Sequence, residues 1–225
     1  MLFSYKTCIL YIILEIVLFA RMFYPEFVEK NVVEKKFVPQ QIAQDMILPE
    51  TKLEQKLLEF PEFLEGLFWG TPRYGHPEGA VLHHVRDVLD NIEKITLSAL
   101  DRERLRLVAI VHDTFKYVED RSAQRDWSQH HSILARRFFE QMSDDKVVLN
   151  LLELHDEAYY AWRFHKAGCF GECERRLEKI MHHFGNDLQL FYTFFKCDTC
   201  TGDKDPTPMF WFENLFEEKI KKILI

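Results

Sequence analysis

Glycine and proline are scarce in this sequence, which has 225 residues and only eight of each. Hydrophobic residues make up 47% of the chain and phenylalanine occurs 20 times, which is too apolar for a disordered protein and argues against a β-rich one with many turns. Only five cysteines are present. This odd number, without a convincing secretory signal, favours reduced thiols in a cytoplasmic setting. The composition therefore predicts a compact helical protein with a sizeable core.

The chain also lacks an excess of positive charge. It has 29 Lys and Arg residues against 36 Asp and Glu residues, which gives a net charge of −7. An extended nucleic-acid surface requires clustered cations, so we expect none here, although a local basic pocket is compatible with this charge. A Gly-rich phosphate loop and a Ser-centred nucleophile motif are absent as well, so we expect neither kind of chemistry.

No hydrophobic run is long enough to cross a bilayer. The longest, Cys8–Ala20, has 13 residues and contains Glu15, whereas a spanning helix needs about 20 apolar residues. No small-residue cleavage site follows it. We therefore expect a docked helix rather than a membrane anchor, and Met22 is a second candidate for the first residue. The predicted organisation is an N-terminal helical extension over 1–49 and one main domain over 50–225.

The segment Leu105–Lys116 predicts a buried helix that ends in a histidine and an aspartate. His112 and Asp113 are adjacent there, and Lys116 follows three residues later. Such a pair is poorly suited to a core but well suited to binding a divalent metal. Further ligands must come from elsewhere, and the chain offers candidates on other apolar segments: His84, His131, His155 and Asp198.

Helical periodicity selects between neighbouring candidates. On the helix predicted from Gly79 to about Ile95, His84 lies at the edge of the apolar stripe and His83 lies nearly opposite. On the helix predicted over 129–142, His131 joins the apolar stripe and His130 does not. Asp198 ends the apolar face of 186–198, where a carboxylate is costly unless it is paired or bound to a metal.

The ordered set His84, His112-Asp113 and Asp198, with an inner H-D-x-x-K element, resembles the HD superfamily of metal-dependent phosphohydrolases. The stretch from His76-Pro77-Glu78-Gly79 to His84-Val85-Arg86-Asp87 is similar to the first-ligand helix in the HD domains of CCA-adding tRNA nucleotidyltransferases. His131 and His155 fall where that family has later ligands. The resemblance covers roughly residues 70–204 and does not include a nucleotidyltransferase part.

This resemblance implies an all-α fold, an HD-type helical bundle around a His/Asp metal centre. His84, His112, Asp113 and Asp198 would hold one ion, and His131 and His155 would complete a set for two. The implied cofactor is one or two divalent ions of Mn, Mg, Fe or Co. Asp113 and Lys116 are the implied catalytic residues, and Lys116, Arg163 and Arg73 are candidates for binding substrate phosphate.

The implied function is hydrolysis of a phosphate ester, with a nucleotide or related small phosphorylated molecule as the partner. The same ligand set also resembles the di-iron oxygenases of the superfamily, and a non-catalytic metal-binding module stays open. A homodimer is compatible with the sequence.

Several other features have two interpretations. Cys169 and Cys173 with Cys197 and Cys200 would form a four-thiolate zinc site, but reduced structural cysteines are favoured. Glu119 and Asp120 form a small acidic patch that would orient a water or face solvent, and we expect them to face solvent. We expect the polar loop 121–128 to lie over the site as a lid. Asp156 and Glu157 are close enough to His155 to support the metal ligands.

Overall fold

The structure of the protein, a computed structural model, describes residues 39–225. The apolar segment Cys8–Ala20 and Met22 lie outside this range, so the expectations about them stay predictions. Between residues 39 and 225 the chain is helical and contains no strand, as the composition predicts; one isolated β-bridge pairs Arg73 with His76. A search of the same range finds no helix with the length and apolar character needed to cross a membrane.

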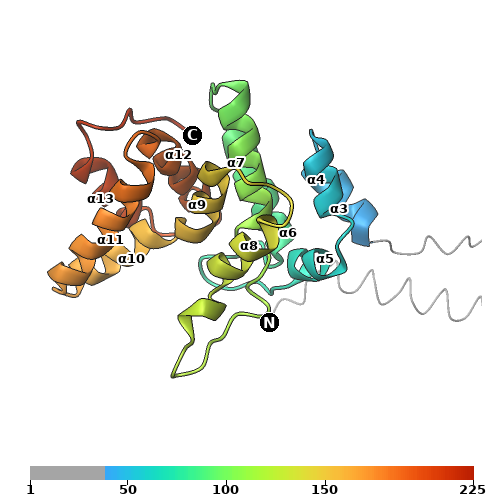
Figure 1. Ribbon diagram of the computed structural model, residues 1–225, viewed down its shortest axis with the longest axis horizontal. Coiled ribbons are helices and arrows are strands. Elements are labelled where there is room, and N and C mark those ends of the chain that lie inside the picture. Colours follow the sequence, from blue (N-terminus) through green and yellow to red (C-terminus); the bar gives the residue numbers. More distant parts are fainter. Residues whose placement is uncertain (1–38) are drawn as a thin grey trace, which may run out of the picture. The chain divides into compact units, whose positions relative to one another are not determined.

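The helices follow one another with short connections (Figure 1). Their bounds are α3 Pro39–Ile47, α4 Lys52–Leu57, α5 Pro61–Phe68, α6 Val81–Glu93, α7 Ala99–Val111, the 3₁₀ helix η1 Trp127–Gln129, α8 His131–Phe139, α9 Lys146–Leu154, α10 Glu157–Lys166, α11 Phe170–Phe184, α12 Leu188–Thr199 and α13 Thr207–Leu215.

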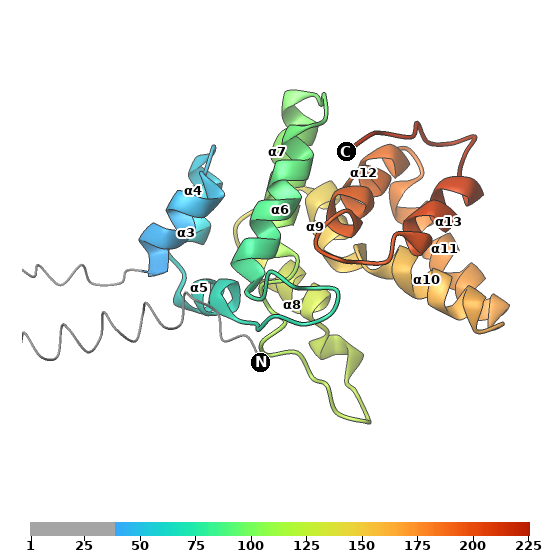
Figure 2. The same ribbon diagram turned by 180° about the vertical axis from the view of Figure 1, so that it is seen from behind.

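Helices α6 and α7 form the centre of the described fold and pack against each other, as the views from both sides show (Figures 1 and 2). Helix α6 also contacts α3, α5 and α12, and α7 contacts α9 and α12. The apolar stripes predicted on α6 and α7 are buried in one continuous core. The predicted faces are confirmed, because His84 is buried and His83 is exposed. Helix α3, which lies within the predicted extension, contributes Ala43 and Ile47 to the same core.

The C-terminal helices pack mainly on one another. Helix α10 contacts α11 and α13, and α11 contacts α12 (Figure 2). The segment 147–165 forms two helices, since α9 ends at Leu154 and α10 starts at Glu157. The last helix, α13, ends at Leu215.

Both His-Asp doublets occupy the same position, at the C-terminal end of a buried helix. His112 follows α7 as its C-cap, and His155 follows α9 in the same way. Asp113 and Asp156 both lie in turns directly after these helices. Adjacent helical residues diverge by about 100°, and the turn allows both members of a doublet to face one site.

The loop before α6 depends on a glycine. Gly79 has φ +84°, in the left-handed region, and a Cβ there would lie 2.9 Å from Cδ of Pro72. Only glycine fits such a position without strain. The turn delivers the chain to Val81, the first residue of α6, and so sets the position of His84 one turn later.

We expect the substitution Gly66→Ala to destabilise the protein by about 1–3 kcal/mol or more, because overpacking strains a close backbone contact. A Cβ at Gly66 of α5 would lie 1.8 Å from the carbonyl oxygen of Thr114, directly after the first doublet. Urea unfolding of the two proteins measures this difference. The control is Gly171→Ala in α11, where a Cβ meets nothing within 4 Å and stability should rise slightly. Equal effects at both glycines would contradict the prediction.

Candidate metal centre

The structure brings the six predicted ligands into one cluster from five places in the chain. The four histidine rings are at most 3% exposed and Asp113 is 4% exposed. The ligands come from α6, the end of α7, the start of α8, the end of α9 and the end of α12: His84, His112, Asp113, His131, His155 and Asp198. The cluster divides into two groups whose ligand atoms lie within 4.8 Å of one another.

The first group consists of His84, His112 and Asp198. The Nε2 atom of His84 lies 2.9 Å from Asp198 Oδ1, and Nε2 of His112 lies 3.8 Å from the same oxygen. Asp113 lies next to this group. Its Oδ2 atom is 3.7 Å from His84 Nε2 and 3.5 Å from His112 Nε2.

The second group consists of Asp113, His131 and His155. The Nε2 atoms of the two histidines are 3.2 Å apart. Asp113 Oδ1 lies 3.5 Å from His131 Nε2 and 3.8 Å from His155 Nε2. Asp113 therefore has one carboxylate oxygen facing each group, which is the arrangement of a bridging ligand between two ions.

These distances fit ligands that share an ion. Metal bonds to nitrogen and oxygen are about 2.1 Å long, so two ligand atoms on one ion lie about 3–4 Å apart. The Nε2 atoms of His84 and His112 are buried and have no hydrogen-bond partner. A buried polar atom without a partner is costly. A cation between these rings and the two carboxylates would satisfy both nitrogens.

Backbone contacts orient two of the rings. Nδ1 of His112 is 3.0 Å from the carbonyl oxygen of Ala109, and Nδ1 of His155 is 2.9 Å from that of Leu152. A carbonyl accepts only from a protonated nitrogen, so Nδ1 carries the hydrogen and Nε2 presents its lone pair to the cluster. Each contact spans three residues within the preceding helix turn, which explains why both doublets use the same helix end.

Electrostatics keep His112 and Asp113 in the forms that bind a metal. Complete burial lowers the pKa of His112 to about 3, although Asp113 and Asp198 oppose this shift, so the ring is neutral near pH 7. Burial raises the pKa of Asp113, but His112, Lys116 and His131 outweigh it and hold that pKa well below its usual value. Neutral imidazole and ionised carboxylate are the forms that bind metals.

Two lysines contact the carboxylates of the cluster. Lys116, the last residue of the H-D-x-x-K element, forms an ion pair with Asp113 Oδ2. Lys204 Nζ lies 2.8 Å from Asp198 Oδ1 and 3.0 Å from the Asp198 carbonyl oxygen. Lys204 follows Asp198 in the turn 201–204.

The expectation that Glu119 faces solvent is wrong. Its side chain is only 6% exposed, and Oε1 lies 3.4 Å from His131 Nδ1 and 3.5 Å from His130 Nε2. Burial raises the pKa of Glu119, but the contacts to His131, His130 and Arg125 outweigh it and lower that pKa to about 2. The position of Glu119 in a turn left no periodic pattern that would have indicated burial.

His130 is a second residue that periodicity missed. It lies off the apolar stripe as predicted, yet it is buried, because its position before α8 makes it the N-cap. Its Nδ1 accepts from the backbone of Ser132, and Nε2 lies 3.2 Å from the Tyr160 hydroxyl.

The two acidic residues after His155 have different surroundings. Asp156 Oδ2 lies 3.3 Å from His131 Nε2 and 3.6 Å from His155 Nε2, so it is as close to these rings as Asp113 is. Glu157 instead pairs with Arg176 and Lys179 of α11. Only Asp156 is in reach of the second group.

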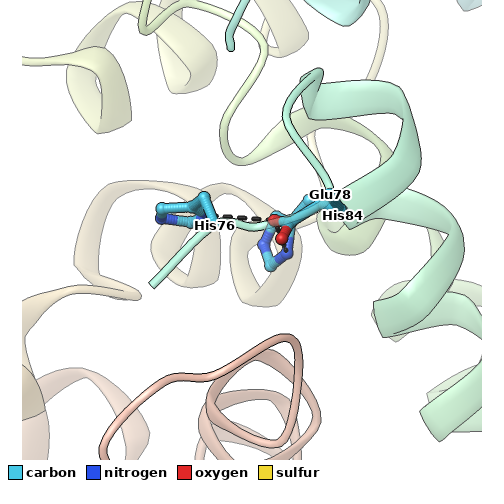
Figure 3. A group of neighbouring side chains, drawn as sticks. All are labelled: His76, Glu78 and His84. Atoms are coloured by element: carbon cyan, nitrogen blue, oxygen red, sulfur yellow. Dashed lines mark hydrogen bonds and ion pairs between the residues drawn. The ribbon is translucent and has the colours of Figure 1, made fainter. Parts of the chain in front are cut away.

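A further carboxylate, Glu78, lies next to His84 in the loop before α6. Its Oε1 atom is 3.0 Å from His76 Nδ1 and 3.6 Å from His84 Nδ1, so the carboxylate stands between the two rings (Figure 3). His76 is half-buried beside the cluster.

An open pocket of about 630 Å³ reaches the cluster from solvent. Asp113, His131, His155 and Asp198 form its inner wall. The remaining lining includes three further carboxylates, Glu119, Asp156 and Asp205, beside a set of cations and aromatic rings: Lys116, Arg121, Arg125, Lys204, Tyr74, Tyr159, Tyr160 and Trp162. Two of these cations, Arg121 and Arg125, come from the polar loop that was expected to lie over the site.

The two arginines predicted to bind phosphate differ in position. Arg73 lines a small cleft with Lys116, His76 and Asp113, and its guanidinium lies over the Trp69 ring. Arg163 is exposed and stacks on Tyr159, so the structure does not bring it to the cluster. Among residues 39–225, no group of metal-ligating side chains contains a cysteine, which disfavours the four-thiolate zinc site.

Comparison with known proteins identifies one family. A family model described as HD domain matches residues 81–184, a range that contains both doublets, His84 and His131 but ends before Asp198. No curated protein and no solved structure matches the chain.

Proposed function

From the match of residues 81–184 to the HD domain, a domain typical of metal-dependent hydrolases, we propose that the chain is a metal-dependent phosphohydrolase acting on a small phosphate ester. The observation that carries the proposal is the carboxylate of Asp113, which has one oxygen toward each of two ligand groups at the base of a cation-lined pocket. When bound, divalent ions lower the pKa of a coordinated water and neutralise charge on phosphoryl oxygens.

The pocket supports a phosphorylated substrate. Lys116 and Lys204 each contact a carboxylate of the cluster and also line the pocket, so their ammonium groups stand next to the reacting centre. Arg121 and Arg125 add guanidinium groups from the loop above. Cations placed where negative charge accumulates stabilise the transition state of phosphoryl transfer.

A nucleotide is the substrate class that suits the rest of the pocket. Tyr74, Tyr159 and Trp162 line it together with the cations, and Tyr74 is 82% exposed. Aromatic faces stack on nucleobases with little dependence on sequence. A base on these rings would direct its phosphate toward the lysines. The volume of the pocket is in the range of small-molecule sites.

The test is phosphate release from a panel of nucleotides and sugar phosphates, measured on protein stripped of metal and then supplied with Mn²⁺, Mg²⁺, Co²⁺ or Fe²⁺. We expect release only with added metal and two ions per chain. The variant His155→Gln should retain one ion, because it removes a ligand of the second group alone. Two bound irons with oxygen consumption and no phosphate release would overturn the proposal in favour of the di-iron oxygenase. Bound metal without either activity would favour the non-catalytic module.

A further inference from the structure

The four histidines of the cluster differ in the group that faces Nδ1, the ring nitrogen that does not point into the cluster. His112 and His155 use a backbone carbonyl within their own helix. His84 and His131 face carboxylates instead, Glu78 and Glu119. The difference follows from position in the helix. His112 and His155 follow the last turns of their helices, whereas His84 and His131 lie in the first turns of α6 and α8.

Two arginines hold Glu119 in place beside His131. Its Oε1 atom lies 3.2 Å from Arg125 Nη2, and Oε2 lies 3.4 Å from Arg121 Nε. His131 Nδ1 is buried and has no hydrogen-bond partner, and Glu119 Oε1 is the carboxylate oxygen that faces it at 3.4 Å. A hydrogen on His131 Nδ1 that points to the Glu119 carboxylate would give this nitrogen a hydrogen-bond partner.

Glu78 has the same relation to His84. Its side chain is 9% exposed, and its contact with His76 holds it beside the His84 ring (Figure 3). Thr201 Oγ1 also lies 3.4 Å from His84 Nδ1, but this hydroxyl donates its own hydrogen to the Asp198 carbonyl and so can only accept from the ring. His84 therefore has two acceptors behind it.

We propose that Glu119 and Glu78 are positioning residues that hold His131 and His84 in the metal-binding orientation, each for a different ion. The inference rests on the two-ion centre of the proposed function and not on its substrate. A carboxylate that accepts from Nδ1 keeps the hydrogen there, fixes the ring plane and increases the donor strength of Nε2. Glu119 would serve the ion at Asp113 and His155, and Glu78 the ion at His112 and Asp198.

The experiment is a calorimetric titration of metal-free protein with Mn²⁺ alone, for Glu119→Gln, Glu78→Gln and the control Glu140→Gln. Loss of a partner behind a ligating histidine weakens metal binding about 10- to 100-fold. We expect each of the first two variants to weaken one ion by this factor and leave the other unchanged, with the smaller effect for Glu78 because Thr201 remains. Glu140 follows α8 and is exposed, so its variant should bind as the wild type does.

Combining each variant with His155→Gln shows which of the two ions the variant affects. The ion that remains there should be insensitive to Glu119→Gln but weakened by Glu78→Gln. Glu119→Asp, which retains the charge, should recover part of the affinity and provides a second variant if the glutamine form does not fold by circular dichroism. Unchanged affinities in both glutamine variants, or equal loss of both ions in each, overturn the inference while phosphate release can stand. Selective loss without phosphate release in the wild type supports the inference and overturns the proposed function.

Discussion

Substitution of Asp113 by asparagine is expected to abolish binding of both metal ions and to reduce phosphate release by roughly a thousandfold or more, since metal stabilisation of the transition state amounts to several kcal/mol. The reason is geometric. Asp113 is the residue with one oxygen toward His84 and His112 and the other toward His131 and His155. Asparagine has the same shape but lacks the charge, and its NH₂ group cannot coordinate a cation.

The measurement combines elemental analysis for bound metal with the phosphate-release assay. Asp90→Asn is the matched control, because Asp90 lies on the exposed face of α6 and pairs with Arg86. It should retain two ions and full activity. Two ions and activity within about tenfold of wild type in Asp113→Asn would show that this carboxylate does not bridge the groups.

The largest effect on stability is expected from Arg106→Met, which should lower the free energy of unfolding by about 3–5 kcal/mol. The Arg106 side chain is 1% exposed and Glu54 is fully buried. Nε and Nη2 of Arg106 donate to the two oxygens of Glu54 at 3.0 and 3.1 Å, and Nη2 also donates to the Leu48 carbonyl oxygen at 3.1 Å. Removal of the guanidinium leaves a buried carboxylate without its partner.

Urea unfolding tests this prediction. The control is Arg104→Met, two residues earlier on α7, whose ion pair with Asp145 is partly exposed and should contribute only about 0–1 kcal/mol. The double variant Arg106→Met with Glu54→Leu should recover much of the loss, because no charge remains buried. Equal costs for the two arginines would contradict the argument.

The sequence predicted the helical class and the buried faces because both depend on local periodicity. A stripe that repeats every 3.6 residues identifies the face of a helix that will be covered, wherever the covering element comes from. This was enough to separate His84 from His83. It was not enough for helix ends: no glycine or proline marks the break after Leu154, where the His155-Asp156 doublet turns toward the cluster.

By itself, then, the sequence determined the all-α class, the family resemblance and which six side chains are candidate ligands. Only the tertiary structure decided the distances between them and which further residues join them. Helices that are distant in sequence meet at one point, and this contact sets which ligands each oxygen of Asp113 faces. It also sets how close Asp156 and Lys204 lie to the cluster and why Glu119 and His130 are buried. Turn and cap residues have no periodic pattern, so their burial is set by what packs over them, and that information is not local.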